Sequence, residues 1–361
     1  MMSKPNRRLF LLSATGAAVG GCSSASDEAL RVFVYSGGHE ATMREVFAPS
    51  FEALTGKKVA LTAGWWEGIA KLKAAPADNP PFDLMITDAT QGFPAARDGL
   101  FHPIDLSMVP HHRDLAPVTL DHWVFKEKVG IPYPDSVMTL AYRHDIAKRP
   151  TRWADLLAGE HTGQLGLYQH FYMSLYTIAA MLADSLGKAG QAEAMIESDL
   201  DEVMRFAREQ AKRVKLWWKT SPDMILALAQ NGARLGNMHS PEYIQAMREN
   251  NQLAAVVPEA DRAFVQVFWA IPAGCPRLEL AYRALNLLFS KEVQIAMAKR
   301  GSATSRLDAA QFVAEGDPLW ASLYPHTSGQ FGQLRYYPYD RYARDWDEIT
   351  DVWQRTVLEQ R

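Results

Sequence analysis

Short apolar runs alternate with amphipathic segments through the first quarter of the chain. Residues 30–35 (Leu-Arg-Val-Phe-Val-Tyr) are mostly apolar and include β-branched and aromatic side chains, which predicts a buried strand. Apolar residues at helical spacing then predict a helix from Glu40 to Leu54 that ends at Gly56. A strand at 58–61, a short helix at 67–75 and a strand at 82–86 follow. This order predicts a doubly wound, mostly parallel sheet.

The alternation continues to about residue 300. Residues 130–133 and 138–142 are expected to form two strands around a turn, and later strands are expected at 164–168, 234–238, 253–257 and 265–271. Helices are expected at 173–186, 200–212, 223–231, 242–250, 278–289 and 291–300. We find no internal repeat, so two α/β blocks with crossing connections are predicted rather than one continuous sheet.

The N-terminus has the form of an export signal. Arg7 and Arg8 precede a short apolar stretch, which predicts a twin-arginine-type signal peptide over residues 1–21, although an ordinary signal also tolerates this pair. Small residues directly before Cys22 resemble a lipobox, so we expect Cys22 to be lipidated and residues 22–29 to form a tether. The alternative is a plain signal peptide in which Cys22 is incidental.

Composition narrows the function classes. The net charge is -3, and removing the signal makes the chain more acidic because that segment carries bases and no acids. No basic block or aromatic–basic alternation is present, which argues against nucleic-acid binding. With Cys22 acylated, Cys275 has no cysteine left to pair with, so no intrachain disulfide is expected. No Gly-x-Ser-x-Gly, phosphate-loop, Gly-x-Gly-x-x-Gly or His-Glu-x-x-His motif is found, and we expect no enzyme.

Seven stretches, in this order, resemble the bacterial ABC-transporter extracellular solute-binding proteins (family 1), in particular the spermidine/putrescine- and iron-binding-like branch. The resemblance covers about residues 30–311, and residues 312–361 match less clearly. The matching stretches are residues 32–36, 51–59, 82–87, 98–105, 130–133, 151–156 and 269–274.

The resemblance implies a two-lobed α/β clamp, the type II periplasmic-binding-protein fold, in which each lobe has a doubly wound, mostly parallel sheet. Residues 30–138 would begin lobe 1, residues 139–268 would form lobe 2, and residues 269–361 would return to lobe 1 and add C-terminal helices. A small polar solute would bind between the lobes by hinge closure. The protein would then be a monomer without cofactor, lipid-anchored in the periplasm or at the cell surface, delivering solute to an ABC permease. The alternative role is a ligand-sensing receptor without transport.

Strand ends that the resemblance places at the cleft supply the candidate ligand-binding residues. In the polyamine-binding relatives, ammonium groups meet carboxylates and the carbon chain lies on aromatic faces. Here the lobe 2 acidic pair is replaced by Gln169 and His170, while Asp88 and Asp135 could supply negative charge or act as turn and cap residues. Trp66 and Glu242 are further strand-end positions. The candidates are Tyr35, Ser36, Gly37, His39, Trp65, Asp88, Tyr133, Asp135, Gln169, His170, Tyr172, His239 and Trp269.

Two other ligand classes stay open beside a polyamine-like cation. The turn at residues 36–38 offers backbone N–H groups that could hold a carboxylate or phosphonate, with His39, His170 and His239 nearby, or it is simply a tight turn. Tyr336 and Tyr337 resemble the adjacent tyrosines that bind Fe(III) in some relatives, but their aromatic-rich surroundings favour packing.

Overall fold

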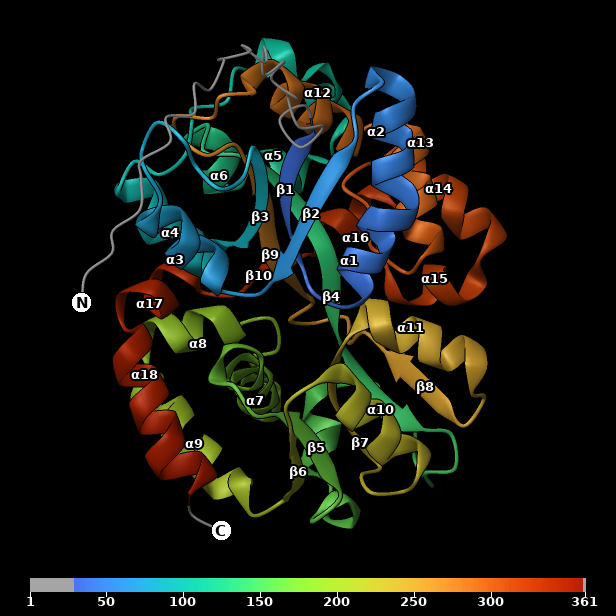
Figure 1. Cartoon of the computed structure of the whole chain (residues 1–361). Helices are drawn as coiled ribbons and strands as arrows, with labels where there is room; N and C mark the ends of the chain where they lie inside the picture. Colours follow the sequence, from blue (N-terminus) through green and yellow to red (C-terminus); the bar gives the residue numbers. More distant parts are fainter. Residues whose placement is uncertain (1–28, 360–361) are drawn as a thin grey trace, which may run out of the picture.

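The computed structural model describes residues 29–359, in which two lobes are joined by the long strand β4 (Ile131–Arg143) (Figure 1). The predicted signal peptide, Cys22 and the tether up to residue 28 lie outside the described residues, so their roles stay predictions. No helix within the described part is both long and apolar enough to cross a membrane.

The first lobe is built on a sheet with strand order β2-β1-β3-β9-β4. Three strands, β1 (Leu30–Tyr35), β2 (Val59–Gly64) and β3 (Leu84–Asp88), are parallel, as the sequence predicts. Strand β9 (Ala263–Ala270) runs antiparallel to β3 and to the first part of β4, and β10 (Arg335–Tyr336) pairs with it. Helices of the chain before β4 are α1 (Gly38–Thr42), α2 (Ala48–Thr55), α3 (Glu67–Ala74), α4 (Ala89–Arg97), α5 (Pro117–Leu120) and α6 (Trp123–Lys126). Helices after β9 are α12 (Leu278–Leu288), α13 (Lys291–Lys299), α14 (Leu307–Gly316), α15 (Pro318–Leu323) and α16 (Ser328–Gly332).

Helices α1 and α2 are joined by a π-helical turn, Met43–Phe47, so that residues 38–55 form one continuous helix. It ends at Gly56, whose φ of 68° is the left-handed conformation that favours glycine at a helix C-terminus. The sequence prediction of this helix and its end is therefore confirmed.

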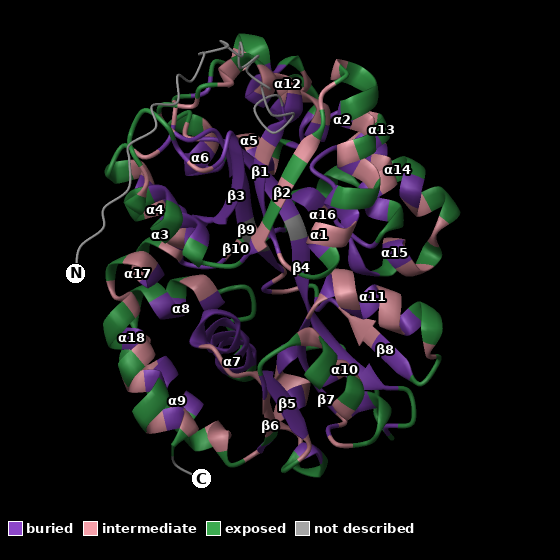
Figure 2. Cartoon of the chain, in the orientation of Figure 1, coloured by how far each residue is buried: buried purple, intermediate pink, exposed green. Residues whose placement is uncertain are grey.

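The second lobe contains the parallel strands β5 (Leu165–Tyr168), β6 (Val214–Trp218) and β7 (Leu235–His239). The second part of β4 runs antiparallel to β7 and to β8 (Leu253–Val256). Helix α7 is buried along nearly its whole length (Figure 2), because its sequence is apolar on all faces. The helices are α7 (Phe171–Ser185), α8 (Ala192–Ser198), α9 (Leu200–Ala211), α10 (Ser221–Ala229) and α11 (Ser240–Glu249).

The prediction of two strands and a turn between residues 130 and 142 is wrong. Strand β4 is continuous, and its partner changes from β9 to β7 and β8 where the register shifts between Pro134 and Val137. Pro132 and Pro134 are tolerated in this strand, because a proline that lacks an N–H can lie beside such an irregularity. Because β4 belongs to both sheets, it is one of the covalent connections between the lobes.

The lobe boundaries differ in two places from the expected ones. Strand β9 begins at Ala263 and lies in the first sheet, so the chain returns to lobe 1 before residue 269. The C-terminal helices α17 (Tyr339–Arg344) and α18 (Trp346–Trp353) do not both stay with lobe 1, since α17 contacts α4 whereas α18 contacts α7 of lobe 2. A π-helical turn, Gln354–Leu358, follows and contacts α9.

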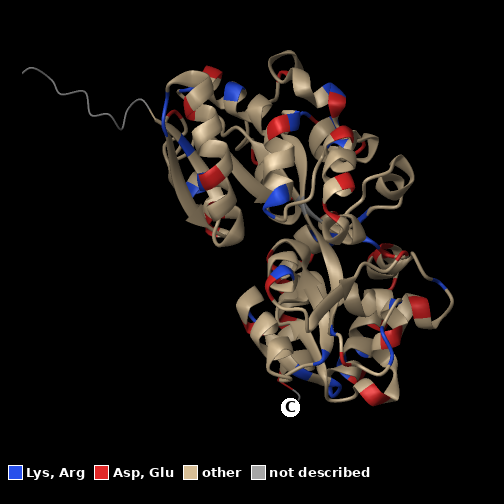
Figure 3. Ribbon diagram, turned by 90° about the vertical axis from the view of Figure 1, so that its right-hand side faces the viewer, with Lys and Arg blue, Asp and Glu red and all other residues tan. Residues whose placement is uncertain are grey.

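A buried ion cluster fixes the first lobe. The carboxylate of Asp83, with no exposed surface, lies 2.8 Å from the guanidinium of Arg31 in β1 and 3.2 Å from that of Arg277 before α12. A buried carboxylate needs such paired charges to offset its lost hydration. In the view of Figure 3, acidic and basic positions are interspersed over both lobes.

Candidate ligand-binding site

The carboxyl ends of β1 and β2 bring together four of the predicted residues. The ring of Tyr35 stacks on Trp65, with centroids 5.6 Å apart and planes 19° from parallel. The backbone N–H of Tyr35 donates to Nδ1 of His39 at 3.3 Å, and the His39 ring lies 5.8 Å from the ring of Trp269. Trp65 is 56% exposed whereas Trp269 is fully buried, so Trp65 is available to a ligand and Trp269 packs behind His39.

His39 has a defined protonation state. Burial lowers its pKa to about 4, so the ring is neutral near pH 7. Because Nδ1 accepts the Tyr35 N–H, the ring proton must be on Nε2. Among the described residues this buried Nε2 has no hydrogen-bond partner, which leaves one donor directed to whatever fills the space beside it.

The turn at residues 36–38 has fewer free backbone N–H groups for an anion than predicted. The N–H of Ser36 is already bonded to the carbonyl oxygen of Gly64 at 2.9 Å, as a continuation of the β1–β2 pairing. Gly37 has a φ of 89°, which explains why glycine occupies the tight strand-to-helix connection.

Asp88 ends β3 and is the N-cap of α4, where its Oδ1 accepts the N–H of Gln91 at 3.0 Å. Its other oxygen, Oδ2, is buried and has no partner among the described residues. Burial raises the pKa of Asp88 to about 6, so the carboxyl is largely ionised at pH 7 at an energetic cost. An ionised buried oxygen without a hydrogen bond is energetically unfavourable, so a donor group on a bound solute would stabilise it.

Lobe 2 contributes four of the predicted residues, which follow β5 or end β7: Gln169, His170, Tyr172 and His239. His170 is the N-cap of α7, its Nδ1 accepting the N–H of Tyr172 at 3.3 Å, and burial lowers its pKa to about 4. His239 ends β7, its Nε2 is buried without a partner among the described residues, and burial lowers its pKa to about 4. The ring of Tyr168 lies 6.4 Å from both imidazoles.

Gln169 is held by its backbone. Its N–H donates to the carbonyl oxygen of Trp218, and its own carbonyl oxygen accepts the indole N–H of Trp353 at 2.8 Å. Trp217 and Trp218 pack as expected, Trp217 against Trp353 and Trp218 against Tyr168.

Two contacts cross between the lobes beside these residues. The ring of Trp66 lies 4.7 Å from that of His170. Glu242, on α11, faces Gly38, and Oε1 would lie 3.5 Å from a β-carbon at that position. Burial raises the pKa of Glu242. The two lobes therefore meet through an aromatic contact and through a carboxyl that, among the described residues, forms no salt bridge.

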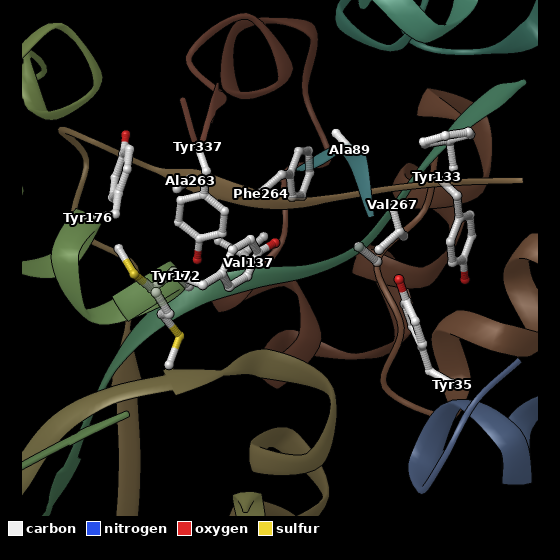
Figure 4. Packing of buried hydrophobic residues seen from close by; sticks show 14 of the residues in the cluster. Tyr35, Ala89, Tyr133, Val137, Tyr172, Tyr176, Ala263, Phe264, Val267 and Tyr337 are labelled. Carbon is white, nitrogen blue, oxygen red and sulfur yellow. The ribbon is translucent and has the colours of Figure 1, made fainter. Parts of the chain in front are cut away.

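Tyr172 completes the junction from the lobe 2 side. Burial, with the nearby Asp88 and Tyr35 among the smaller causes, raises the pKa of Tyr172 well above its usual value. Its ring lies 4.8 Å from that of Tyr337, which in turn lies 5.1 Å from Tyr176 (Figure 4). Tyr172 thus places a neutral phenol near Asp88, across the lobe boundary.

The structure does not bring Tyr133 to this set. Its ring is buried beside Phe289, and its hydroxyl contacts Sδ of Met297 at 3.9 Å, in the interior of the first lobe. Asp135 lies in β4, but its side chain is outside what the structure describes, so its role stays a prediction.

An iron site at the tyrosine pair finds no support in the geometry. The hydroxyl of Tyr336 donates to the carbonyl oxygen of Val118 at 3.1 Å, and Tyr337 packs on Tyr172 and Tyr176. Within residues 29–359, no group of three or more His, Cys, Asp or Glu side chains is placed to hold a metal ion.

Trp346 is a neighbour of the site that sequence reasoning missed. Its ring lies 5.2 Å from His170 and 5.4 Å from Trp66. The only sequence signal was an aromatic residue in an amphipathic C-terminal helix, which gives no indication of the surface that the helix contacts.

Solved structures share this architecture. The spermidine/putrescine substrate-binding protein PotD of Streptococcus pneumoniae, in complex with calcium and HEPES, matches with a TM-score of 0.74 at 19% identity, over 92% of this chain and 99% of that chain. AgtB from A. tumefaciens R10, in complex with agropinic acid, gives 0.69 at 18% identity over 91% and 98%. A GABA receptor gives 0.75 at 18% identity over 92% and 98%. These likenesses confirm the predicted two-lobed α/β fold.

A search of curated proteins finds no significant match. A family model described as bacterial extracellular solute-binding protein, in contrast, matches residues 47–323, most of the described chain. Proteins of this family capture solutes in the periplasm or at the cell surface. With the two-lobed fold and a set of unpartnered polar groups between its lobes, the chain belongs to the bacterial extracellular solute-binding protein family.

Proposed function

We propose that the chain is the solute-binding component of an ABC importer, which captures a small polar solute between its lobes and delivers it to a permease without chemical change. Family membership supports the general role. The contacts of Trp66 and Gly38 with lobe 2 support a site that is complete only when the lobes are together. A solute that touches both lobes favours the closed arrangement, and that arrangement is what a permease would recognise.

We further propose that the solute carries an ammonium group, as a polyamine does. The observation that carries this proposal is Asp88, a buried carboxylate whose Oδ2 has no partner within the described residues. Glu242 supplies a second, partly buried carboxyl from the opposite lobe. An ammonium group would offset the lost hydration of either, and the stacked rings of Tyr35 and Trp65 offer a face to the cation and its methylenes.

A second candidate is a solute that also bears an anionic group. The observation that favours it is the unpartnered Nε2–H of the neutral His39, which would donate to a carboxylate oxygen. An amino acid with separated charged ends would satisfy His39 and Asp88 together. The two candidates differ in whether the carboxylate is required.

Isothermal titration calorimetry of the mature chain tests both candidates, with putrescine, spermidine, 4-aminobutyrate and butyrate as titrants. The first candidate predicts binding of the diamines, the second predicts binding of 4-aminobutyrate alone, and binding of butyrate alone would overturn the ammonium requirement. Asp88→Asn and Glu242→Gln should each weaken binding about tenfold to a hundredfold, the cost of losing a hydrogen bond to a charged group. Asp105→Asn is the matched control, because Asp105 also caps a helical turn but is exposed.

The lipid anchor is a separate proposal at Cys22. Cys22→Ser should move the protein from the membrane fraction to the soluble envelope fraction without changing solute affinity. A variant that stays with the membrane would contradict lipidation at this cysteine. Lysine at both Arg7 and Arg8 should block export only if the twin-arginine route is used.

A further inference from the structure

The C-terminal segment 339–358 contacts both lobes. In α17, the ring of Tyr339 stacks on Trp123, with centroids 5.5 Å apart, and lies 5.6 Å from Phe93 in α4. In α18, the indole N–H of Trp353 donates to the carbonyl oxygen of Gln169. Figure 1 shows this segment passing from α4 of the first lobe to α9 of the second. It therefore spans the junction on one side of the molecule.

Trp346 stands at the start of α18, in the middle of this span. Its ring lies 5.2 Å from His170, 4.8 Å from Phe171 and 5.4 Å from Trp66, with a 90° edge contact to the last. Trp66 itself lies 4.7 Å from His170. Three rings, from the loop after β2, the loop after β5 and the C-terminal segment, thus contact one another pairwise.

We propose that Trp346 is a positioning residue for solute binding, which holds His170 in place and forms with Trp66 an aromatic latch between the lobes. The proposal rests on the proposed function, because it assumes that the solute binds where the lobes meet. The aromatic latch consists of Trp66, His170 and Trp346.

The latch favours the closed arrangement for a geometric reason. Trp66 belongs to lobe 1, whereas His170 and Phe171, which Trp346 contacts, belong to lobe 2. Separation of the lobes breaks both contacts of Trp66 while those among the lobe 2 rings persist. Trp66 is 37% exposed with both contacts made, so most of its surface is covered in the closed arrangement and would become exposed when the two ring contacts are lost on opening.

The population of closed molecules can be measured without knowing the solute. Spin labels at Glu52→Cys on α2 and Arg208→Cys on α9, both exposed positions, report the distance between the lobes in a chain that also carries Cys22→Ser and Cys275→Ser. Trp346→Ala and Trp66→Ala should each raise the ratio of long to short distances about tenfold in the solute-free protein. The variant with both Trp66→Ala and Trp346→Ala should have the same ratio of long to short distances as Trp66→Ala alone. Trp346→Phe, which keeps a ring, should restore part of the short-distance population.

Trp217→Phe is the matched control, since Trp217 contacts the same segment through Trp353 at a ring distance of 5.6 Å, within lobe 2. It should leave the distance distribution unchanged, and urea unfolding should show that all variants are folded. A distribution unchanged by Trp346→Ala, or shifted equally by Trp217→Phe, overturns the latch. Titration with putrescine is kept separate, because a protein that closes through the latch but does not bind putrescine contradicts only the proposed solute class.

Discussion

Glu242 of the second lobe lies against the backbone of Gly38 in the first, with Oε1 3.5 Å from the place that a β-carbon on residue 38 would occupy. Gly38 begins α1 directly after the turn that follows β1, and Glu242 lies in the first turn of α11 after β7. The distance is an ordinary van der Waals contact, so the space between the lobes admits one more carbon atom at residue 38 and little beyond it.

A bulky substitution at Gly38 should therefore hinder closure of the lobes without destabilising the folded protein. Gly38→Ala fits and should leave putrescine affinity within about threefold, whereas Gly38→Val should weaken it about tenfold because its γ-carbons meet Glu242 before the lobes close. Calorimetry measures the affinity and urea unfolding the stability, which should stay near that of the unsubstituted chain. Gly329→Val is the control, since Gly329 also lies in the first turn of a short helix and has open space around it. Equal affinity of the alanine and valine variants would contradict the contact.

Asp88→Asn should stabilise the solute-free protein. The pKa of about 6 in the folded protein lies above the ordinary value of 3.8 for an aspartate, so Asp88 contributes stability that is fully present below pH 3.8 and is lost as pH rises through 6. At pH 7 the ionised form thus costs up to about 3 kcal/mol, which asparagine removes while still accepting the N–H of Gln91. Urea unfolding at pH 7 and pH 4 measures the effect. A gain at pH 7 that persists undiminished at pH 4 would argue against an ionisation effect.

The histidines between the lobes should make the protein sensitive to mild acid. Burial lowers the pKa of His39, His170 and His239 from 6.5 to about 4. Between these values the unfolded chain binds more protons than the folded one, so stability should fall as pH drops from 6.5 towards 4. Asp88 and Glu242, whose pKa values burial raises, act in the opposite direction, whereas His122, whose pKa burial lowers to about 3, acts in the same direction as the three histidines.

His239→Gln tests this expectation, because the buried Nε2 atom of His239 has no hydrogen-bond partner within residues 29–359. A shift of this size corresponds to about 3 kcal/mol, so the variant should lose visibly less unfolding free energy between pH 7 and pH 4. Exchange of the half-exposed His112, whose ring hydrogen-bonds to the carbonyl oxygen of Val109, is the matched control. An identical slope in both variants would show that His239 does not titrate in this range.

The sequence predicted those strands and helices whose ends are marked by neighbouring residues. Strand β1 could be predicted because its consecutive apolar residues indicate burial. The helix that ends at Gly56 could be predicted because glycine favours the left-handed conformation at a helix C-terminus. Placement of Tyr35, His39 and Trp65 at one edge followed from a general property, that parallel strands end at the same side of a sheet.

Contacts between residues that are far apart in the sequence could not be predicted. Tyr133 was expected at the cleft because it ends an apolar run, but its ring faces Phe289, and only the pairing of β4 with β9 determines the side on which it lies. Trp346 meets His170 across a large sequence separation, and no periodicity specifies such a contact. Continuity of β4 through two prolines depended in the same way on its neighbouring strands.

The closest approach of two strands in lobe 2 provides a test of folding alone. Gly166 in β5 pairs with Gly236 in β7, and a β-carbon on Gly236 would lie 1.7 Å from the carbonyl oxygen of Gly166 and 2.9 Å from Cε of Met224. Since the first neighbour is backbone, only separation of the strands could relieve the overlap, and Gly236→Ala should lower the unfolding free energy by about 3 kcal/mol or more. Gly159→Ala, where nothing lies within 4 Å, is the control and should be nearly neutral. Urea unfolding gives the free energies, and solute affinity should fall only as the folded fraction falls, unlike Gly38→Val. A stable Gly236→Ala protein with normal affinity would mean that β5 and β7 are farther apart than this register requires.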